Sequence, residues 1–301
     1  MLRRSMGVAA EGLRGDAMQA AFQEAVSGRP ERLYTLLGIS SGLPGTRVNL
    51  TMAQAFAVEC MGRGKAADKL LLGMCMLSPE VAPGATEHEF LPVCGVLALG
   101  SRAASDKEPE LRKKALPILH ALSEDMRFRV RDIVPIALGK MGANMGDALV
   151  HEFASWTDGF FQGAAALLAM AQPNFLPVIN DVDAALARLD EAYALAKNAP
   201  RSTARYPGFK ALIDALGIAP AALATRFGVP VFDHLAAWSN TEMPELRGAI
   251  ETAINSGKLT SRYAQEVKRV RAALVASIPP PRDPTMAIKG MRSRGKKHSR
   301  R

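Results

Sequence analysis

In 126-MRFRVRDIVPIALGKMG-142, apolar residues recur at steps of three and four positions. This spacing places them on one broad face, which predicts a core-facing helix. The preceding segment, 109-PELRKKALPILHALSED-125, has the same periodicity, and its last residues, 123-SED-125, predict a polar turn. The two segments together predict an antiparallel helical hairpin. We find no alternating apolar and polar stretch bounded by hairpin turns, so we expect no strand.

The second helix of this hairpin has a copy earlier in the chain. Aligning 90-FLPVCGVLALGSRA-103 with 129-RVRDIVPIALGKMG-142 superposes the apolar positions and places Gly100 on Gly139, at an offset of 39 residues (129 against 90). Weaker copies, each an apolar helix ending in glycine, are 49-NLTMAQAFAVECMGRG-64 and 244-PELRGAIETAINSGKL-259. Their final glycines are expected to cap the helices, because glycine adopts left-handed geometry readily.

A period of roughly 40 residues per two-helix unit is that of HEAT and armadillo repeats. The segment 123-SEDMRFRVRDIVPIALGKMG-142 resembles the second helix of a HEAT repeat. The features that carry the resemblance are Asp125 in the turn, Arg129 or Arg131 in the arginine position, and Ala137-Leu138-Gly139 closing the helix. The resemblance implies an all-α fold, a right-handed α-α superhelix of HEAT-like hairpins in which one row of helices lines the concave face. It leaves the function open.

Clusters of proline and glycine mark the joints between the predicted helices. They are 42-GLPGT-46, 78-SPEVAPGA-85, 172-QPN-174, 199-APRSTARYPG-208 and 228-GVP-230. None is long enough to be a domain linker, so we predict a flexible N-terminus (1–15) and one HEAT-like α-solenoid domain (16–278). The proline run 279-PPPRDPT-285 ends the last predicted helix, 260–277. It begins a Pro-containing linker and disordered basic tail, 279–301, with too little apolar content to fold alone.

The composition predicts a folded, soluble protein. Hydrophobic residues make up 48% of the 301-residue chain, which is enough for a large core. The longest apolar runs, such as 91-LPVCGVLALG-100, have about half of the roughly 20 residues needed to cross a bilayer. Charged residues at Glu11, Arg14 and Asp16 interrupt any signal-peptide core. We therefore expect a cytoplasmic protein with no membrane partner.

The three cysteines are expected to be structural. Cys60, Cys75 and Cys94 lie far apart within apolar runs and lack the CxxC spacing of a zinc site. This pattern predicts buried, reduced thiols, with neither disulfides nor a bound metal.

The net charge of +9 is concentrated at the C-terminus. The last thirteen residues contain no acid and seven bases, which are Lys289, Arg292, Arg294, Lys296, Lys297, Arg300 and Arg301. Without these seven, 31 of the 38 basic residues remain against 29 acidic ones, so the body is nearly neutral. A body that grips duplex DNA usually carries a basic stripe. We therefore predict that the tail contacts nucleic acid or another polyanion; a purely solubilising tail is the alternative.

No motif predicts a catalytic, metal or cofactor site. His151-Glu152 begins like a zincin motif but lacks the second histidine, and 139-GKMGANMG-146 lacks the order of a phosphate-binding loop, so we interpret it as a helix end followed by a loop. The acids at 181-DVD-183 and 190-DE-191 are interpreted as helix-terminus or solvated residues, although paired catalytic carboxylates stay open. We expect a protein without catalytic activity and leave an enzymatic role open.

Three functions fit these observations. The first is a non-catalytic scaffold, in which the solenoid binds a protein partner and the tail contacts a polyanion. The second follows from a weaker resemblance to HEAT-like alkylpurine DNA glycosylases, which use aromatic and acidic groove residues; here Trp156, Asp158 and Trp238 would form the groove. The third is a maturation factor that acts on another protein without needing the tail.

Overall fold

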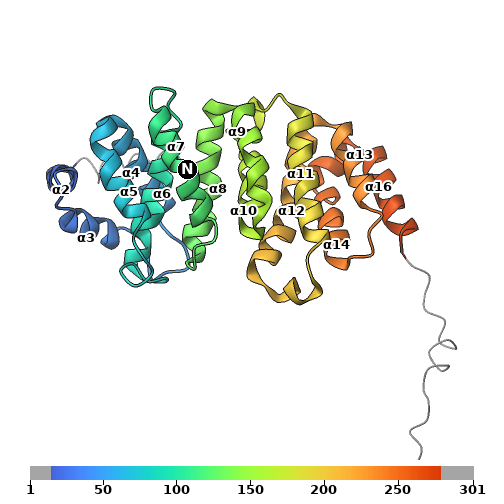
Figure 1. The fold of residues 1–301 in the computed structure, drawn as a ribbon, viewed down its shortest axis with the longest axis horizontal. Coiled ribbons are helices and arrows are strands. Elements are labelled where there is room, and N and C mark those ends of the chain that lie inside the picture. The colour runs from blue at the N-terminus through green and yellow to red at the C-terminus, as the bar shows by residue number, and fades with distance from the viewer. Residues whose placement is uncertain (1–14, 279–301) are drawn as a thin grey trace, which may run out of the picture.

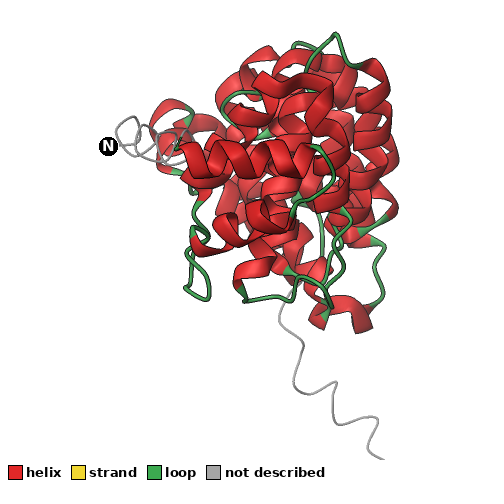
Figure 2. Cartoon of the chain, turned by 90° about the vertical axis from the view of Figure 1, so that its left-hand side faces the viewer, coloured by secondary structure: helices red, strands yellow, loops and turns green. Residues whose placement is uncertain are grey.

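The computed structural model describes residues 15–278, and this part of the chain is all-helical, with no strand. The helices follow one another in chain order along the long axis of the molecule (Figure 1). Viewed from its N-terminal side, the described part contains only helices and the loops that join them (Figure 2). The predicted all-α class is therefore confirmed.

Six helices form a row in which each packs against the next, and we call this the main row. Its members are α4 (Leu50–Arg63), α6 (Phe90–Ala103), α8 (Phe128–Met145), α10 (Phe160–Met170), α12 (Pro207–Phe227) and α14 (Pro244–Ile254). Residues from nearly every turn of α6 are buried, since α4, α5, α7 and α8 all pack against it.

A second set of helices packs against the main row, and we call it the covering row. Its members are α5 (Asp68–Cys75), α7 (Pro109–Leu122), α9 (Asp147–Glu152) continued by η3 (Phe153–Asp158), α11 (Val182–Lys197), α13 (Val229–Trp238) and α16 (Ala264–Ala276). The remaining elements are α2 (Asp16–Val26), α3 (Glu31–Ile39), α15 (Gly257–Arg262), η1 (Gly64–Ala67), η2 (Glu87–Glu89), η4 (Leu176–Val178) and η5 (Arg201–Arg205).

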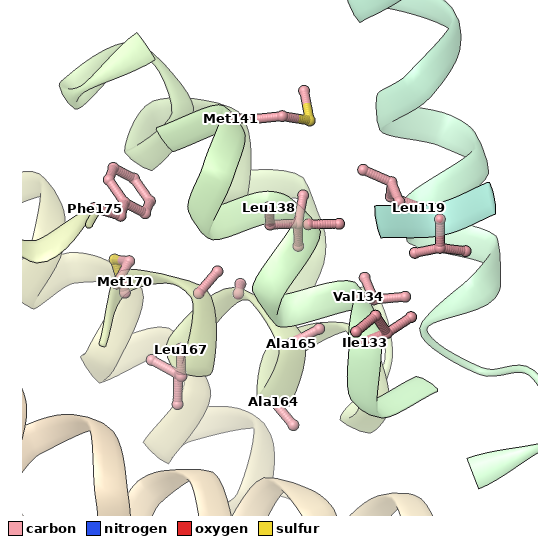
Figure 3. Packing of buried hydrophobic residues seen from close by; sticks show 14 of the residues in the cluster. Leu119, Ile133, Val134, Leu138, Met141, Ala164, Ala165, Leu167, Met170 and Phe175 are labelled. Carbon is pink, nitrogen blue, oxygen red and sulfur yellow. The ribbon is translucent and has the colours of Figure 1, made fainter. Parts of the chain in front are cut away.

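The core lies between the two rows. Figure 3 shows how α8 fills it: apolar side chains on α8 point toward α7 on one side and toward α10 on the other. The labelled side chains of α8 are Ile133, Val134, Leu138 and Met141, and those around them are Leu119, Ala164, Ala165, Leu167, Met170 and Phe175. This is the apolar face that the three- and four-residue spacing predicts.

The predicted hairpin is present as α7 and α8. The turn between them covers 123–127, and Asp125 organises it by accepting hydrogen bonds from the backbone and guanidinium of Arg127, each at 2.8 Å. The second helix begins at Phe128 because Arg127, held by Asp125, keeps an extended backbone. The helix starts two residues later than the periodicity alone suggests.

Gly100 and Gly139, which the alignment superposes, lie inside their helices. Gly139 was predicted to close its helix. α6 continues past Gly100 to Ala103, and α8 continues past Gly139 to Met145, so Gly139 does not close its helix. A Cβ at Gly100 would lie 2.6 Å from the carbonyl oxygen of Ala137 on α8. The missing side chain therefore permits close contact between neighbouring helices.

In the two weaker copies, one glycine caps its helix and the other does not. Gly64 follows α4 with a φ of 60°, so it caps the helix as predicted. α14 ends at Ile254, before Gly257, which instead begins α15. In 139–146 the cap is Gly146, with a φ of 55°, so the predicted loop is mostly helix.

The last predicted helix, 260–277, is two helices. α15 ends at Arg262 and α16 begins at Ala264, because Tyr263 leaves the helical conformation at φ −127° and ψ 43°. Its ring packs against Phe232 of α13 with centroids 5.3 Å apart. The helix break at Tyr263 thus accompanies a tertiary contact, and no proline or glycine at this position predicts it.

Cys60, Cys75 and Cys94 are free and buried, as predicted. Burial raises the pKa of all three thiols, that of Cys75 to about 12, so they stay protonated at neutral pH.

The helix α12 is long and apolar enough to cross a membrane by length and composition alone. Buried core helices of soluble proteins meet the same criterion, and in this structure 56% of the apolar window of α12 is buried.

Candidate functional site

A series of three hollows runs along the exposed face of the main row, and we call it the main-row groove. The first lies between residues 46–51, at the start of α4, and the first half of α8. The second crosses α8, α10 and α12 and has a volume of about 470 Å³, and the third lies between α12 and α14. Neighbouring hollows adjoin one another, because Asp132 and Ile136 line the first two and Asp214 lines the last two.

The floor of the groove is made of small and apolar side chains. The residues that form it in the second and third hollows are Pro135, Ile136, Ala164, Ala165, Leu168, Ala211, Gly217, Gly248 and Ala249. Small side chains leave a depression between packed helices where larger ones would fill it. In the run 163-GAAALLAMA-171, every residue except Leu168 and Ala171 is buried, and the small side chains of Ala164 and Ala165 form part of the floor.

Charged residues of both signs line the groove. Within residues 15–278, six of them form no ion pair: Arg47, Arg131, Asp132, Lys210, Asp214 and Glu245. A seventh, Arg129, pairs at 2.9 Å with Glu89, which is fully buried. The groove therefore presents neither the uniformly basic surface that a phosphate backbone requires nor a purely apolar one.

Arg131 is fixed at the edge of the second hollow. Its guanidinium donates to the carbonyl oxygens of Asp125 and Met126 in the α7–α8 turn, and it lies 4.6 Å from the centre of the Phe161 ring. These contacts hold its charge in place without neutralising it. The arginine is therefore preorganised to meet an acidic group.

A hydrogen-bonded clamp borders the same hollow. Glu124 accepts a hydrogen bond from the Tyr206 hydroxyl at 2.9 Å and another from the Gln162 amide at 3.4 Å. These three residues come from the starts of three successive main-row helices or the turns before them. The hydrogen bond to the carboxylate raises the pKa of Tyr206, so the hydroxyl remains a donor at neutral pH.

The residues predicted from the sequence as a DNA-binding groove lie in the covering row. Trp156 is 3% exposed and packs edge-on against Phe153 and His120, and Asp158 pairs with His120 at 3.0 Å. None of these side chains lines the three hollows of the main-row groove. Burial gives Trp156 a packing role.

Trp238 belongs to a separate cluster between α11 and α13. Its indole N–H donates to Asp190 at 2.7 Å, and its ring stacks on Tyr193 with centroids 5.2 Å apart. The other carboxylate oxygen of Asp190 lies 2.8 Å from Nδ1 of His234. Asp190 thus contacts both Trp238 and His234 of α13. The sequence 190-DE-191 alone did not predict this role.

The structure forms histidine contacts that the sequence did not predict. His151 pairs with Asp181 at 3.2 Å, in addition to the pairs His120–Asp158 and His234–Asp190. All three join neighbouring elements of the covering row or its turns. Within residues 15–278 no group of three or more His, Cys, Asp or Glu side chains is arranged to hold a metal ion.

The seven basic residues of the predicted tail, Lys289, Arg292, Arg294, Lys296, Lys297, Arg300 and Arg301, lie outside the described residues. The groove was not predicted from the sequence. Arg129 and Arg131 contributed only to the HEAT resemblance, and charges at helical spacing are typical of any solvated helix face. No protein-family model and no curated protein matches the chain.

Proposed function

We propose that this chain is a non-catalytic binding protein. In this proposal its hairpins form a HEAT-like right-handed α-α superhelix, the main-row groove holds a protein partner, and the basic tail contacts nucleic acid or another polyanion. The observation that carries it is the groove: three adjoining hollows with a largely apolar floor and charges of both signs among their lining residues. Protein–protein interfaces combine an apolar centre with a polar rim in this way.

The repeat alignment supports the architectural part of this proposal. Gly100 and Gly139, 39 residues apart, occupy equivalent places in α6 and α8 (139 against 100). A Cβ at Gly100 would meet Ala137 of α8, and a Cβ at Gly139 would lie 2.6 Å from the side chain of Gln172, just after α10. Each glycine therefore lies against the next unit of the main row, as expected for stacked repeats.

The charges of the groove favour a protein over DNA. Counting Arg129, four basic and three acidic residues line the three hollows, and the third hollow has only acids, Asp214 and Glu245. Carboxylates on the path of a duplex would repel its phosphates. The glycosylase alternative is thus less well supported, and the free thiols are compatible with a cytoplasmic setting.

Photo-crosslinking tests the groove directly. A photoreactive amino acid replaces Ala211, which lines the second hollow, or Ala272, which is exposed on α16 outside the groove. We expect the Ala211 probe, irradiated in lysate of the native organism, to join the chain to a protein, and the Ala272 probe to give none of that product. Equal products from both positions, or nucleic acid joined at Ala211, would contradict the proposal.

The tail is tested by nucleic-acid binding across a salt series. We expect the full chain to bind labelled duplex DNA and RNA, with a slope of log K against log salt for DNA of up to about −6 for seven basic residues. A chain that ends at Ile278 is expected to lose this binding, because it lacks all seven residues. The measurement is fluorescence anisotropy at 50 to 200 mM salt, roughly the range in which such contacts weaken. Binding of duplex by the shortened chain would instead support the glycosylase alternative.

A further inference from the structure

We propose that the occupant of the main-row groove is an amphipathic α-helix of a partner protein, lying across the main row with its acidic end over α4 and α8 and its basic end over α12 and α14. This inference rests on the proposed function and specifies the partner. It follows from three properties of the groove: its hydrogen-bonding groups, its length and the order of its charges.

The neutral polar side chains of the second and third hollows each donate a hydrogen bond within their own segment. The Ser123 hydroxyl donates to the Leu119 carbonyl at 2.9 Å, the Gln172 amide donates to Leu168 at 3.2 Å, and the Thr252 hydroxyl donates to Gly248 at 2.8 Å. All these acceptors are backbone carbonyls of the preceding helical turn. The donors are therefore occupied within their own helices.

An extended peptide would meet this floor with its backbone unsatisfied. Each N–H and C=O that loses water without finding a partner costs about 1–3 kcal/mol. A helix keeps its backbone hydrogen bonds within itself and needs only apolar side chains to meet an apolar floor. The groove therefore selects a helix over a strand.

The length of the groove sets the length of the helix. Neighbouring packed helices lie about 8–10 Å apart, so the three steps from α8 through α10 and α12 to α14 cover about 24–30 Å. The first hollow, between residues 46–51 and α8, adds about one more step, which gives about 32–40 Å in all. With a rise of 1.5 Å per residue, a helix of about 21–27 residues has this length and covers all three hollows.

The unpaired charges of the groove are ordered along it. Over α4 and α8, Arg47 and Arg131 outnumber Asp132, which leaves one excess positive charge. Over α12 and α14, Asp214 and Glu245 outnumber Lys210, which leaves one excess negative charge.

Charge complementarity at the rim of an interface selects the partner and its orientation. A helix with an acidic end and a basic end, separated by apolar turns, matches this order. A helix that is acidic at both ends meets repulsion over α12 and α14.

Synthetic peptides test the inference with the full-length protein. Two labelled peptides of about 24 residues, long enough to span all three hollows, share one apolar helical face. The first has glutamates at one end and lysines at the other, and the second has glutamates at both ends. By fluorescence anisotropy we expect the first to bind about fivefold more tightly. A third peptide with the composition of the first, but with a central proline that breaks the helix, is expected to bind at least as weakly as the second.

A charge variant supplies the decisive comparison. Asp214→Lys gives both ends of the groove an excess positive charge, so we expect the doubly acidic peptide to become the tighter ligand. Glu152→Lys is the matched control, because Glu152 is exposed on α9 in the covering row, and we expect it to leave the order of affinities unchanged. Circular dichroism confirms that both variants fold.

The outcomes separate this inference from the proposed function. An order of affinities unaffected by Asp214→Lys, equal binding of the proline peptide, or no binding of any peptide would overturn the helical, charge-ordered occupant. A protein product from the Ala211 photo-crosslink would still uphold the proposed function in each case. Loss of that product would overturn the proposed function itself.

Discussion

Replacing Arg129 with methionine is expected to lower the free energy of unfolding by about 3–5 kcal/mol, the range for breaking a buried ion pair from one side. Its partner Glu89 is 0% exposed and accepts hydrogen bonds from Arg129 at 2.9 Å and from the Ala85 backbone at 2.7 Å. The other carboxylate oxygen has no partner within residues 15–278. Without the arginine, a charged carboxylate would remain in the interior with one hydrogen bond.

Two further variants show whether burial causes the effect. Arg32→Met breaks an Arg–Glu pair of similar length, 3.0 Å, whose side chains are 50% and 36% exposed, and it is expected to cost less than about 1 kcal/mol. The double variant Glu89→Gln/Arg129→Met removes the stranded charge and should recover part of the loss. The measurement is guanidinium unfolding. Equal losses for Arg129→Met and Arg32→Met would show that the buried charge is not the cause.

Gly100→Ala should destabilise the protein by roughly 2 kcal/mol, although alanine is the better helix former by about 1 kcal/mol. The new Cβ would lie 2.6 Å from the carbonyl oxygen and 2.8 Å from the Cα of Ala137. Both are backbone atoms of α8, so no side-chain rotation relieves the clash. α6 and α8 would have to separate, and that loosens the core on both sides of the contact.

The control for Gly100 is the same substitution in open space. Gly73 lies in α5, and a Cβ there would meet nothing within 4 Å. Gly73→Ala is therefore expected to stabilise the protein by about 0.5–1 kcal/mol, the helix-propensity gain alone. Opposite signs for the two variants in thermal or denaturant unfolding are the expected result. A stabilised Gly100→Ala variant would contradict the close helix contact that we infer at this position.

Local signals in the sequence predicted much of the helical organisation. The spacing of apolar residues around Ile133 depends only on the 3.6-residue turn of a helix, and the turn at 123-SED-125 depends on polar groups adjacent in the chain. Each signal is complete within about twenty residues. This is why the hairpin of α7 and α8 and the burial of the cysteines were predicted correctly.

The role of Gly139 was predicted wrongly for a physical reason. A glycine at the end of an apolar run has the same sequence appearance whether it caps a helix or lets another helix approach. Which role it takes depends on whether Gln172, more than thirty residues away, packs against it. Tyr263 is a similar case, since its helix break accompanies a contact with Phe232.

The candidate site could not be predicted from the sequence. The main-row groove joins side chains from α4, α8, α10, α12 and α14, and none of these segments contains a binding or catalytic motif by itself. Conversely, the aromatic residues that stood out in the sequence, Trp156 and Trp238, pack against side chains of the covering row.

Periodicity and turn chemistry predicted the helical class and the hairpin of α7 and α8, and composition alone located the excess charge at the C-terminus, because these depend on neighbours in the chain. The groove and the order of its charges depend on how segments 40 to 83 residues apart stack (129 against 89, 214 against 131). Only stacking brings Arg131 and Asp214 to one surface and buries Glu89 beneath Arg129. Such contacts arise from packing and from the cost of burying charge, which no single segment of the sequence reveals.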